Sequence, residues 1–329
     1  MSALLEVEGL EKRYRLRRGR VLQAVAGVSF AIAPGEVLAL VGESGCGKST
    51  IGRCLLRLES PDGGSIRFGG ERVDRLGAGA FRPYRKRIQM VFQDPYGSLD
   101  PRMRVADILA EPLVSLGLAR GTGDAMPRVL ELLDMVRMPR SAAERRPHEF
   151  SGGQRQRIGI ARALAVQPEL IVCDEAVSAL DVSVKAQIVN LLADLRAELG
   201  LAMLFISHDL AIVERIADRV AVMYLGRIAE IGTAEAVLGA PRHPYTRGLL
   251  AAAPRIDAPL DPAVLLTGEP PDPAAPPSGC RFRTRCPRAQ DRCAVEEPQL
   301  VPLDGGRAAA CHFPEPAPAR QDVPALEVP

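Results

Sequence analysis

The segment that decides the fold is Glu36-Val37-Leu38-Ala39-Leu40-Val41-Gly42-Glu43-Ser44-Gly45-Cys46-Gly47-Lys48-Ser49, in a chain of 329 residues. Residues 36–41 are mostly apolar and predict a buried parallel strand, and residues 48–58 are predicted to form the helix that follows. Between them, residues 42–49 match the pattern G-x-x-x-x-G-K-[ST] at every fixed position. Strand, glycine loop and helix in this order are the context of a P-loop, whose backbone N–H groups cradle phosphate oxygens.

The P-loop predicts a nucleotide site with a magnesium ion. Lys48 would supply positive charge to the β- and γ-phosphates, and the Ser49 hydroxyl would ligate Mg²⁺. The residues predicted to bind the phosphates and the ion are Gly42, Ser44, Gly45, Cys46, Gly47, Lys48, Ser49 and Thr50.

A second glycine-rich segment lies about a hundred residues later, at residues 151–154. Ser151 is a favoured N-cap, and the start of a helix binds anions, so this segment predicts a second phosphate contact made by Ser151, Gly152, Gly153 and Gln154. One P-loop with one extra phosphate-binding helix indicates a site that a second chain completes.

Three further predicted strands end in polar residues. Residues 170–173 run into Asp174 and Glu175, residues 202–206 precede His208, and residues 87–93 end at Gln93. Asp174 is predicted to hold Mg²⁺ and Glu175 to polarise the attacking water as general base. His208 would contact the γ-phosphate or that water, and the Gln93 amide would contact Mg²⁺ and the water.

The order of elements predicts an α/β fold with a parallel core sheet, because strands alternate with helices. Short strands before residue 40 predict a β subdomain. Helical spacing in residues 105–116 and 129–138 predicts a helical insertion at about 94–160. We expect one nucleotide-binding domain over residues 1–253 and a Pro-rich extension over residues 254–329, since eight Pro fall within residues 254–279.

Composition narrows the function. The chain is 47% hydrophobic and 25% charged, with a net charge of +2 and no Trp, so we expect no nucleic-acid partner. No apolar run reaches the roughly 18 residues of a membrane span, and the N-terminus has no signal-peptide pattern. We expect a cytoplasmic protein whose membrane role comes through partners.

Taken in order, these motifs resemble those of an ABC ATPase over roughly residues 4–250: Walker A, Q-loop at Gln93, signature at residues 151–154, Walker B at residues 170–175, D-loop at residues 178–181 and switch histidine at His208. The resemblance implies ATP hydrolysis at a seam between two subunits. It also implies that Tyr14 stacks on adenine and that Asp181 lies at the nucleotide site. Phe150 stands where Leu is usual in the signature.

Residues 93–102, 146–150, 243–246 and 279–312 further resemble the ATPases of bacterial oligopeptide and dipeptide importers, whose relatives import nickel or glutathione. This implies a second, non-identical ATPase subunit, although a homodimer stays open. It also implies two permease subunits, an external solute-binding protein and a location at the cytoplasmic face of the inner membrane. The alternatives are a soluble ABC ATPase acting on ribosomes or DNA, which usually carries two nucleotide-binding units or long coiled coils, and a metal-binding regulator with a vestigial ATPase core.

Four of the seven cysteines, Cys280, Cys286, Cys293 and Cys311, lie near the C-terminus with spacing C-x5-C-x6-C-x17-C. Four thiolates can hold tetrahedral Zn²⁺ or a [4Fe–4S] cluster. The resemblance to peptide-importer ATPases implies the iron–sulfur cluster, with Zn²⁺ or four free thiols as the alternatives.

Overall fold

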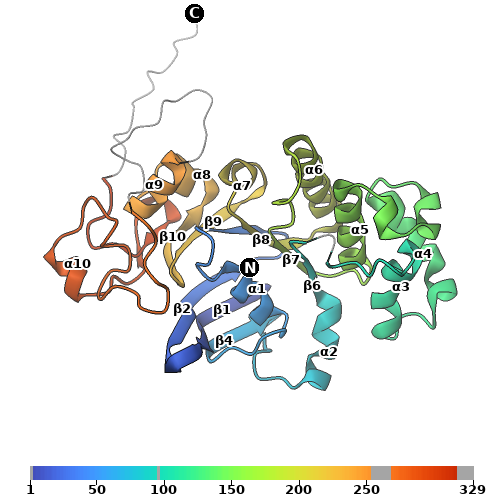
Figure 1. Cartoon of the computed structure of the whole chain (residues 1–329), viewed down its shortest axis with the longest axis horizontal. Helices are drawn as coiled ribbons and strands as arrows, with labels where there is room; N and C mark the ends of the chain where they lie inside the picture. Colours follow the sequence, from blue (N-terminus) through green and yellow to red (C-terminus); the bar gives the residue numbers. More distant parts are fainter. Residues whose placement is uncertain (1–2, 95–96, 253–267, 317–329) are drawn as a thin grey trace, which may run out of the picture.

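The computed structural model describes residues 3–94, 97–252 and 268–316 (Figure 1). Pro95, Tyr96, most of the Pro-rich stretch and the last residues of the predicted extension lie outside the described residues. Among the described residues, no helix is both long enough and apolar enough to cross a membrane.

The N-terminal part forms a four-stranded sheet in the order β2-β1-β4-β5, and the pairs of neighbouring strands are antiparallel. Its strands are β1 (Leu5–Arg15), β2 (Val21–Ile32), β4 (Gly63–Phe68) and β5 (Glu71–Arg72). The predicted β subdomain is therefore present, with longer strands than the sequence indicated.

The core sheet has the order β11-β12-β10-β9-β3-β8-β7-β6. The five strands from β9 to β6 run parallel, and β10, β11 and β12 add antiparallel neighbours at one edge. The strands are β3 (Val37–Val41), β6 (Ile88–Val91), β7 (Leu170–Asp174), β8 (Ala202–Ser207), β9 (Arg219–Tyr224), β10 (Arg227–Thr233), β11 (Val301–Pro302) and β12 (Ala308–Ala309).

Both faces of the core sheet are buried. Along β3, Leu38 and Leu40 pack with the N-terminal sheet and α1 (Lys48–Leu55), whereas Val37, Ala39 and Val41 pack with the helices on the other face. This explains why the strand is apolar at every position, since alternate side chains point to opposite faces. Figure 1 shows the three layers, with the N-terminal sheet below the core sheet and α5 to α8 above it.

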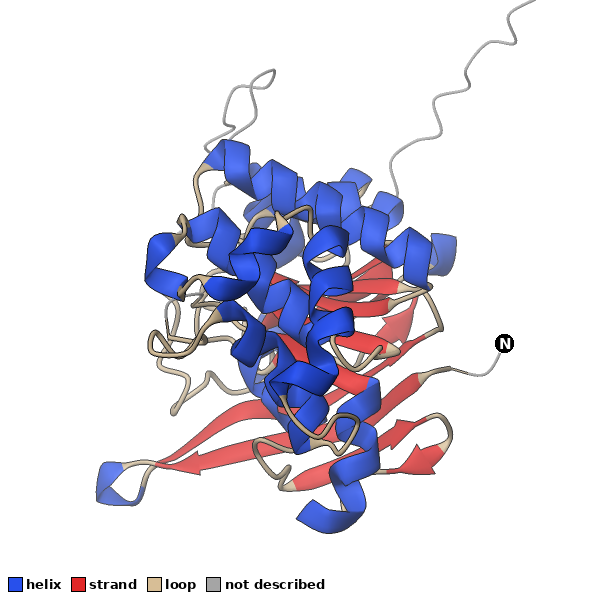
Figure 2. Cartoon of the chain, turned by 90° about the vertical axis from the view of Figure 1, so that its right-hand side faces the viewer, coloured by secondary structure: helices blue, strands red, loops and turns tan. Residues whose placement is uncertain are grey.

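The helical insertion lies at the far end of the core sheet from the C-terminal residues (Figures 1 and 2). Its helices α3 (Val105–Ser115), α4 (Thr122–Met135) and α5 (Gly152–Leu164) share one hydrophobic cluster with the core sheet. Short 3-10 turns at Arg140–Glu144 and Pro147–Glu149 connect α4 to α5. A further turn, Arg17–Gly19, joins β1 to β2.

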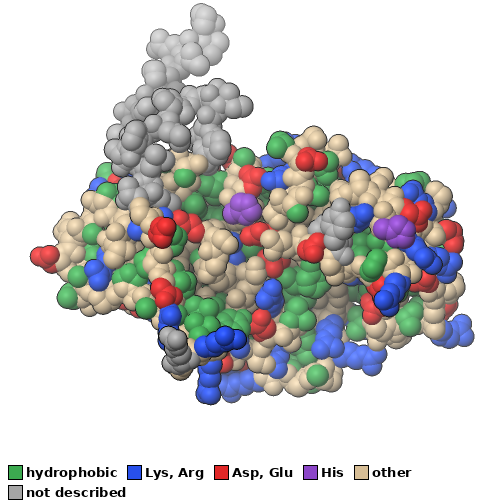
Figure 3. All heavy atoms as spheres, viewed as in Figure 1, with side chains coloured by type: hydrophobic (Ala, Val, Ile, Leu, Met, Phe, Trp, Pro, Cys, Tyr) green, Lys and Arg blue, Asp and Glu red, His purple; other side chains and the backbone are tan. Residues whose placement is uncertain are grey.

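The remaining helices are α2 (Ala78–Arg87), α6 (Val182–Leu199), α7 (Leu210–Ile216), α8 (Ala234–Gly239), α9 (Pro244–Ala251) and α10 (Asp291–Val295), with a 3-10 turn at Asp304–Gly306. Acidic and basic side chains are interspersed over the face seen in Figure 3, and basic ones gather along its lower edge.

Candidate nucleotide site

The P-loop (residues 42–49) connects β3 to α1, and neighbouring strands pack tightly against two of its glycines. Gly42 and Gly47 have φ values of 150° and 107°. A Cβ atom would lie 2.2 Å from the Met223 carbonyl oxygen at Gly42 and 2.1 Å from the Ala24 carbonyl oxygen at Gly47. The motif glycines are thus required by both the backbone conformation and the neighbouring strands β9 and β2.

The Lys48 ammonium lies over this loop. Its Nζ donates hydrogen bonds to the carbonyl oxygens of Gly42 at 2.7 Å and Glu43 at 3.0 Å. These bonds hold the buried Lys48 ammonium against the loop backbone, beside the place where the loop would bind phosphate.

Two of the three predicted magnesium ligands, Ser49 and Asp174, meet where α1 begins and β7 ends, whereas the third, Gln93, donates to Glu175. The Ser49 hydroxyl donates to the Asp174 carboxylate, with 2.7 Å between the oxygen atoms. Burial raises the pKa of Asp174, while the bond from Ser49 acts in the opposite direction. A hydroxyl and a carboxylate at hydrogen-bond distance are the hard oxygen donors that fit Mg²⁺, so these residues suit the ion.

Glu175 brings together the other predicted polar residues. Its Oε2 accepts from Gln93 Nε2 at 3.0 Å, and its Oε1 lies 3.5 Å from His208 Nδ1. Strand β6 ends at Val91, two residues earlier than predicted, so Gln93 reaches Glu175 from the loop that enters the helical insertion. Glu175 has a φ of 47°, which is unusual for a residue other than glycine and is typical of functional sites.

Tyr14 lies on β1 and contacts Thr50, the residue that follows the P-loop. Its hydroxyl hydrogen-bonds to Glu59 and also interacts with Thr50, and the Lys12 ammonium lies 5.4 Å from its ring centroid. Burial, followed by the bond to Glu59, raises the pKa of Tyr14 to about 12. The phenol stays protonated at neutral pH.

The signature segment (residues 151–154) caps α5 with a reciprocal pair of bonds. Ser151 Oγ accepts from the Gln154 N–H at 3.4 Å, and Gln154 Oε1 accepts from the Ser151 N–H at 3.0 Å. This capping box leaves the N–H groups of Gly152 and Gly153 for another acceptor.

The signature segment is not part of this chain's own phosphate loop. A Cβ at Gly153 would lie 2.4 Å from Val184 Cγ1, which places the segment against α6, and Asp181 is the N-cap residue of that helix. Within the described part of the chain, no hydrogen bond joins the signature segment to the P-loop.

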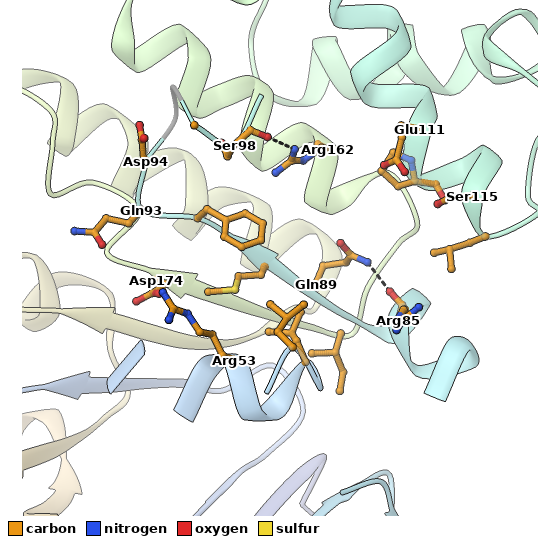
Figure 4. Close-up of a pocket in the computed structure, with 18 of the residues that line it drawn as sticks. Arg53, Arg85, Gln89, Gln93, Asp94, Ser98, Glu111, Ser115, Arg162 and Asp174 are labelled. Atoms are coloured by element: carbon orange, nitrogen blue, oxygen red, sulfur yellow. Dashed lines mark hydrogen bonds between the residues drawn. The ribbon is translucent and has the colours of Figure 1, made fainter. Parts of the chain in front are cut away.

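A broad groove separates α1 and β6 from the helical insertion (Figure 4). Gln93 and Asp174 lie at one end of it, and Arg162 of α5 donates to the Ser98 carbonyl oxygen within it. Arg162 also lies 5.8 Å from the centroid of the exposed Phe92 ring. The groove therefore connects the predicted catalytic residues to the surface of the insertion.

The C-terminal residues were not predicted to contact the nucleotide site, but they do. Arg285 Nη1 and Nη2 lie 2.8 and 2.9 Å from the two carboxylate oxygens of Glu43 in the P-loop. The Glu43 N–H donates to the Tyr245 hydroxyl at 3.0 Å. Glu43, Tyr245 and Arg285 lie within the segments quoted from the sequence, but no pattern in the sequence assigned them a role at the nucleotide site.

The four C-terminal cysteines border one small cavity together with His243 and His312. Burial raises the pKa of the Cys311 thiol to about 12 and also raises the pKa of Cys280 and Cys286. Across residues 3–94, 97–252 and 268–316, no set of three or more His, Cys, Asp or Glu side chains is arranged to hold a metal ion. The four cysteines thus line one cavity, but they are not arranged as the ligands of a single metal ion.

Comparison with known proteins agrees with this geometry. The family model "ABC transporter" matches residues 25–178, and "Oligopeptide/dipeptide transporter, C-terminal region" matches residues 229–293. The chain is 50% identical to a probable peptide ABC transporter ATP-binding protein of Sinorhizobium fredii, over 98% of this chain and 93% of the relative. It is 46% identical to the dipeptide transport ATP-binding protein of Haemophilus influenzae, over 94% of this chain and 96% of the relative.

A solved structure gives the same fold. The dimeric post-hydrolysis state of an ATP-binding cassette bound to ADP and Pi matches with a TM-score of 0.63 and 27% identity, over 70% of this chain and 98% of that one. Together with the near full-length relatives, this shows that the chain belongs to the ABC transporter ATP-binding proteins of the oligopeptide/dipeptide group.

Proposed function

We propose that the chain is the ATP-hydrolysing subunit of an ABC importer that takes up oligopeptides or dipeptides. Membership of the ABC transporter family shows that the chain is an ATPase. Relatives named for peptide, oligopeptide and dipeptide transport support the solute class. The observation that carries the site assignment is the meeting of Gln93, Glu175 and His208 beside the Ser49–Asp174 pair.

In the proposed reaction, the P-loop N–H groups and Lys48 hold the phosphates. Bound Mg²⁺, held by Ser49 and Asp174, would neutralise charge on the β- and γ-phosphate oxygens. Glu175 accepts a proton from the attacking water. The water oxygen bonds to the γ-phosphorus while the bond from that phosphorus to the leaving ADP oxygen breaks. Gln93 and His208 orient Glu175 and the water. This role is consistent with the contact that each of the two side chains makes to one carboxylate oxygen of Glu175.

A second subunit would complete each site. The signature segment of one chain lies against its own α6, with the N–H groups of Gly152 and Gly153 left for an acceptor. We propose that these groups close on the γ-phosphate bound to the partner, a non-identical ATPase subunit. ATP then favours the closed pair and hydrolysis releases it.

Two permease subunits would receive this motion, and an external solute-binding protein would deliver the peptide. The groove in Figure 4 supports the coupling, because Gln93 lies at its end and at the entrance to the helical insertion. In this arrangement the chain is bound at the cytoplasmic face of the inner membrane through the permeases.

We further propose that the C-terminal cysteines hold a [4Fe–4S] cluster, with Zn²⁺ as the alternative. Support comes from the cavity that all four cysteines line. Binding requires the thiols to lose their protons, because thiolates are the ligands of both metal centres. Iron and acid-labile sulfide analysis of anaerobically purified protein tests this. A colourless, zinc-loaded or metal-free sample contradicts the cluster.

Reconstitution tests the transport function. The chain is co-expressed with two permease subunits and a second ATPase subunit of a peptide importer, and the complex is placed in liposomes with the binding protein. We expect uptake of labelled di- and oligopeptides that requires ATP and is abolished by Glu175→Gln. ATP hydrolysis coupled to uptake of nickel or glutathione, with no uptake of the labelled peptides, would refute the proposed solute class. It would leave the assignment of ATPase activity intact.

A further inference from the structure

The P-loop residue Glu43 is held by groups from the other end of the chain. Arg285 binds both of its carboxylate oxygens, at 2.8 and 2.9 Å, and the Arg285 side chain is only 5% exposed. The fully buried Tyr245 accepts the backbone N–H of the same glutamate at 3.0 Å. Lys48 meanwhile donates to its carbonyl oxygen. Glu43 is thus fixed through its side chain, its N–H and its carbonyl group.

Arg285 is itself fixed by packing. Phe282, three residues earlier, is 2% exposed and its ring centroid lies 5.3 Å from that of Tyr224 and 5.4 Å from that of Tyr245. The Arg285 guanidinium also hydrogen-bonds to the Tyr224 hydroxyl at 3.4 Å. Because Tyr224 ends β9 beside the P-loop, this aromatic cluster anchors the C-terminal loop against the nucleotide site.

The charge on Glu43 gives this contact a consequence for ATP. A carboxylate within a phosphate-binding loop repels a triphosphate, and this repulsion is strong where solvent is partly excluded. The Glu43 side chain is 25% exposed, so water screens it only in part. The two parallel bonds from Arg285 both neutralise the carboxylate and hold it toward the C-terminal residues.

We propose that Arg285 is a positioning residue for ATP binding, acting through Glu43 to keep the P-loop in shape and free of uncompensated negative charge. The C-terminal residues are then part of the nucleotide site. This role concerns nucleotide binding alone and does not depend on which solute is transported.

The test compares R285M, E43Q and the double variant E43Q/R285M in the full chain, using a fluorescent ATP analogue and steady-state ATPase rates. R285M should raise the Kd about tenfold and the KM for ATP similarly, with little change in kcat, because the lost interaction acts on binding. E43Q should bind within about threefold of wild type, since it removes the charge that Arg285 neutralises. The double variant should regain most of the lost affinity.

The matched control is R292M, since Arg292 lies in the same extension but pairs only with the exposed Glu296 among the described residues. It should leave the Kd unchanged. Wild-type affinity in R285M would overturn the proposal, and so would a loss that E43Q fails to restore, because a purely structural role of the extension does not depend on the charge of Glu43. If R285M is insoluble, R285Q serves instead: it removes the positive charge but keeps a hydrogen-bonding side chain, so a raised Kd supports the proposal and a wild-type Kd overturns it.

Discussion

The substitution Gly47→Ala tests how tightly the P-loop is packed. Gly47 has a φ of 107°, a left-handed conformation that costs a non-glycine residue about 1–2 kcal/mol. The new Cβ would also lie 2.1 Å from the Ala24 carbonyl oxygen, whereas such contacts are essentially never under 3.0 Å. The loop must therefore move by nearly an ångström, and overpacking of this kind costs about a further 1–3 kcal/mol.

Gly45→Ala is the matched control. Gly45 belongs to the same loop and has a φ of 79°, but a Cβ there would meet no atom within 4 Å. It should lose only the conformational term. We therefore expect the free energy of unfolding to fall by about 2–5 kcal/mol in Gly47→Ala and by about 1–2 kcal/mol in Gly45→Ala.

The effect on ATP follows from the same displacement. Each hydrogen bond to a charged phosphate that is lost should raise the Kd about ten- to a hundredfold. Because the chain has no Trp, circular dichroism in urea follows unfolding, and a fluorescent nucleotide reports binding without a tryptophan background. Equal stability and equal Kd in the two variants would refute the claim that Ala24 and the P-loop are in close contact.

Three further predictions concern the reaction and pH. Glu175→Gln should lower kcat about 10²–10⁴-fold while ATP still binds and a closed dimer accumulates in size-exclusion chromatography; an unchanged kcat would remove Glu175 as general base. Ser151→Ala should lower the ATPase rate of the paired subunits without changing the Kd of the isolated chain for ATP, and a rate equal to wild type would contradict the shared site. Burial lowers the pKa of His243 from 6.5 to about 4, so its contribution to stability is fully present above pH 6.5 and is lost as the pH falls toward 4. Lowering the pH from 7 to 5 should then cost about 2 kcal/mol of unfolding free energy, measured in urea, and His243→Asn, which keeps an N-cap side chain, should remove that part of the pH dependence.

The core of the site could be predicted from the sequence because parallel strands end at the same edge of a sheet. Strands β7 and β8 pair in register, with Asp174 opposite Ile206, so the residues that follow them must lie together. The apolar runs that predicted these strands are buried on both faces, which is why they were recognisable. The capping box of Ser151 and Gln154 was likewise readable from residue types and spacing.

Other parts of the fold and of the site could not be predicted from local sequence patterns. Strand β10 was not predicted, since Arg227 and the buried Glu230 interrupt its apolar pattern. Glu230 is tolerated there because its carboxylate accepts the N–H groups of Arg242 and His243. The pair of Glu43 and Arg285 is separated by 242 residues, and neither periodicity nor a motif relates two side chains at that distance along the chain.

The same separation has a consequence for synthesis on the ribosome. At about 5–20 residues per second, about 10–50 s pass between translation of Glu43 and translation of Arg285. During that interval the nascent P-loop carries an unneutralised carboxylate and lacks its arginine counter-ion. On the role proposed for Arg285, full affinity for ATP is acquired only after the segment around Arg285 emerges and docks, so early folding proceeds without the stabilisation that tight nucleotide binding provides.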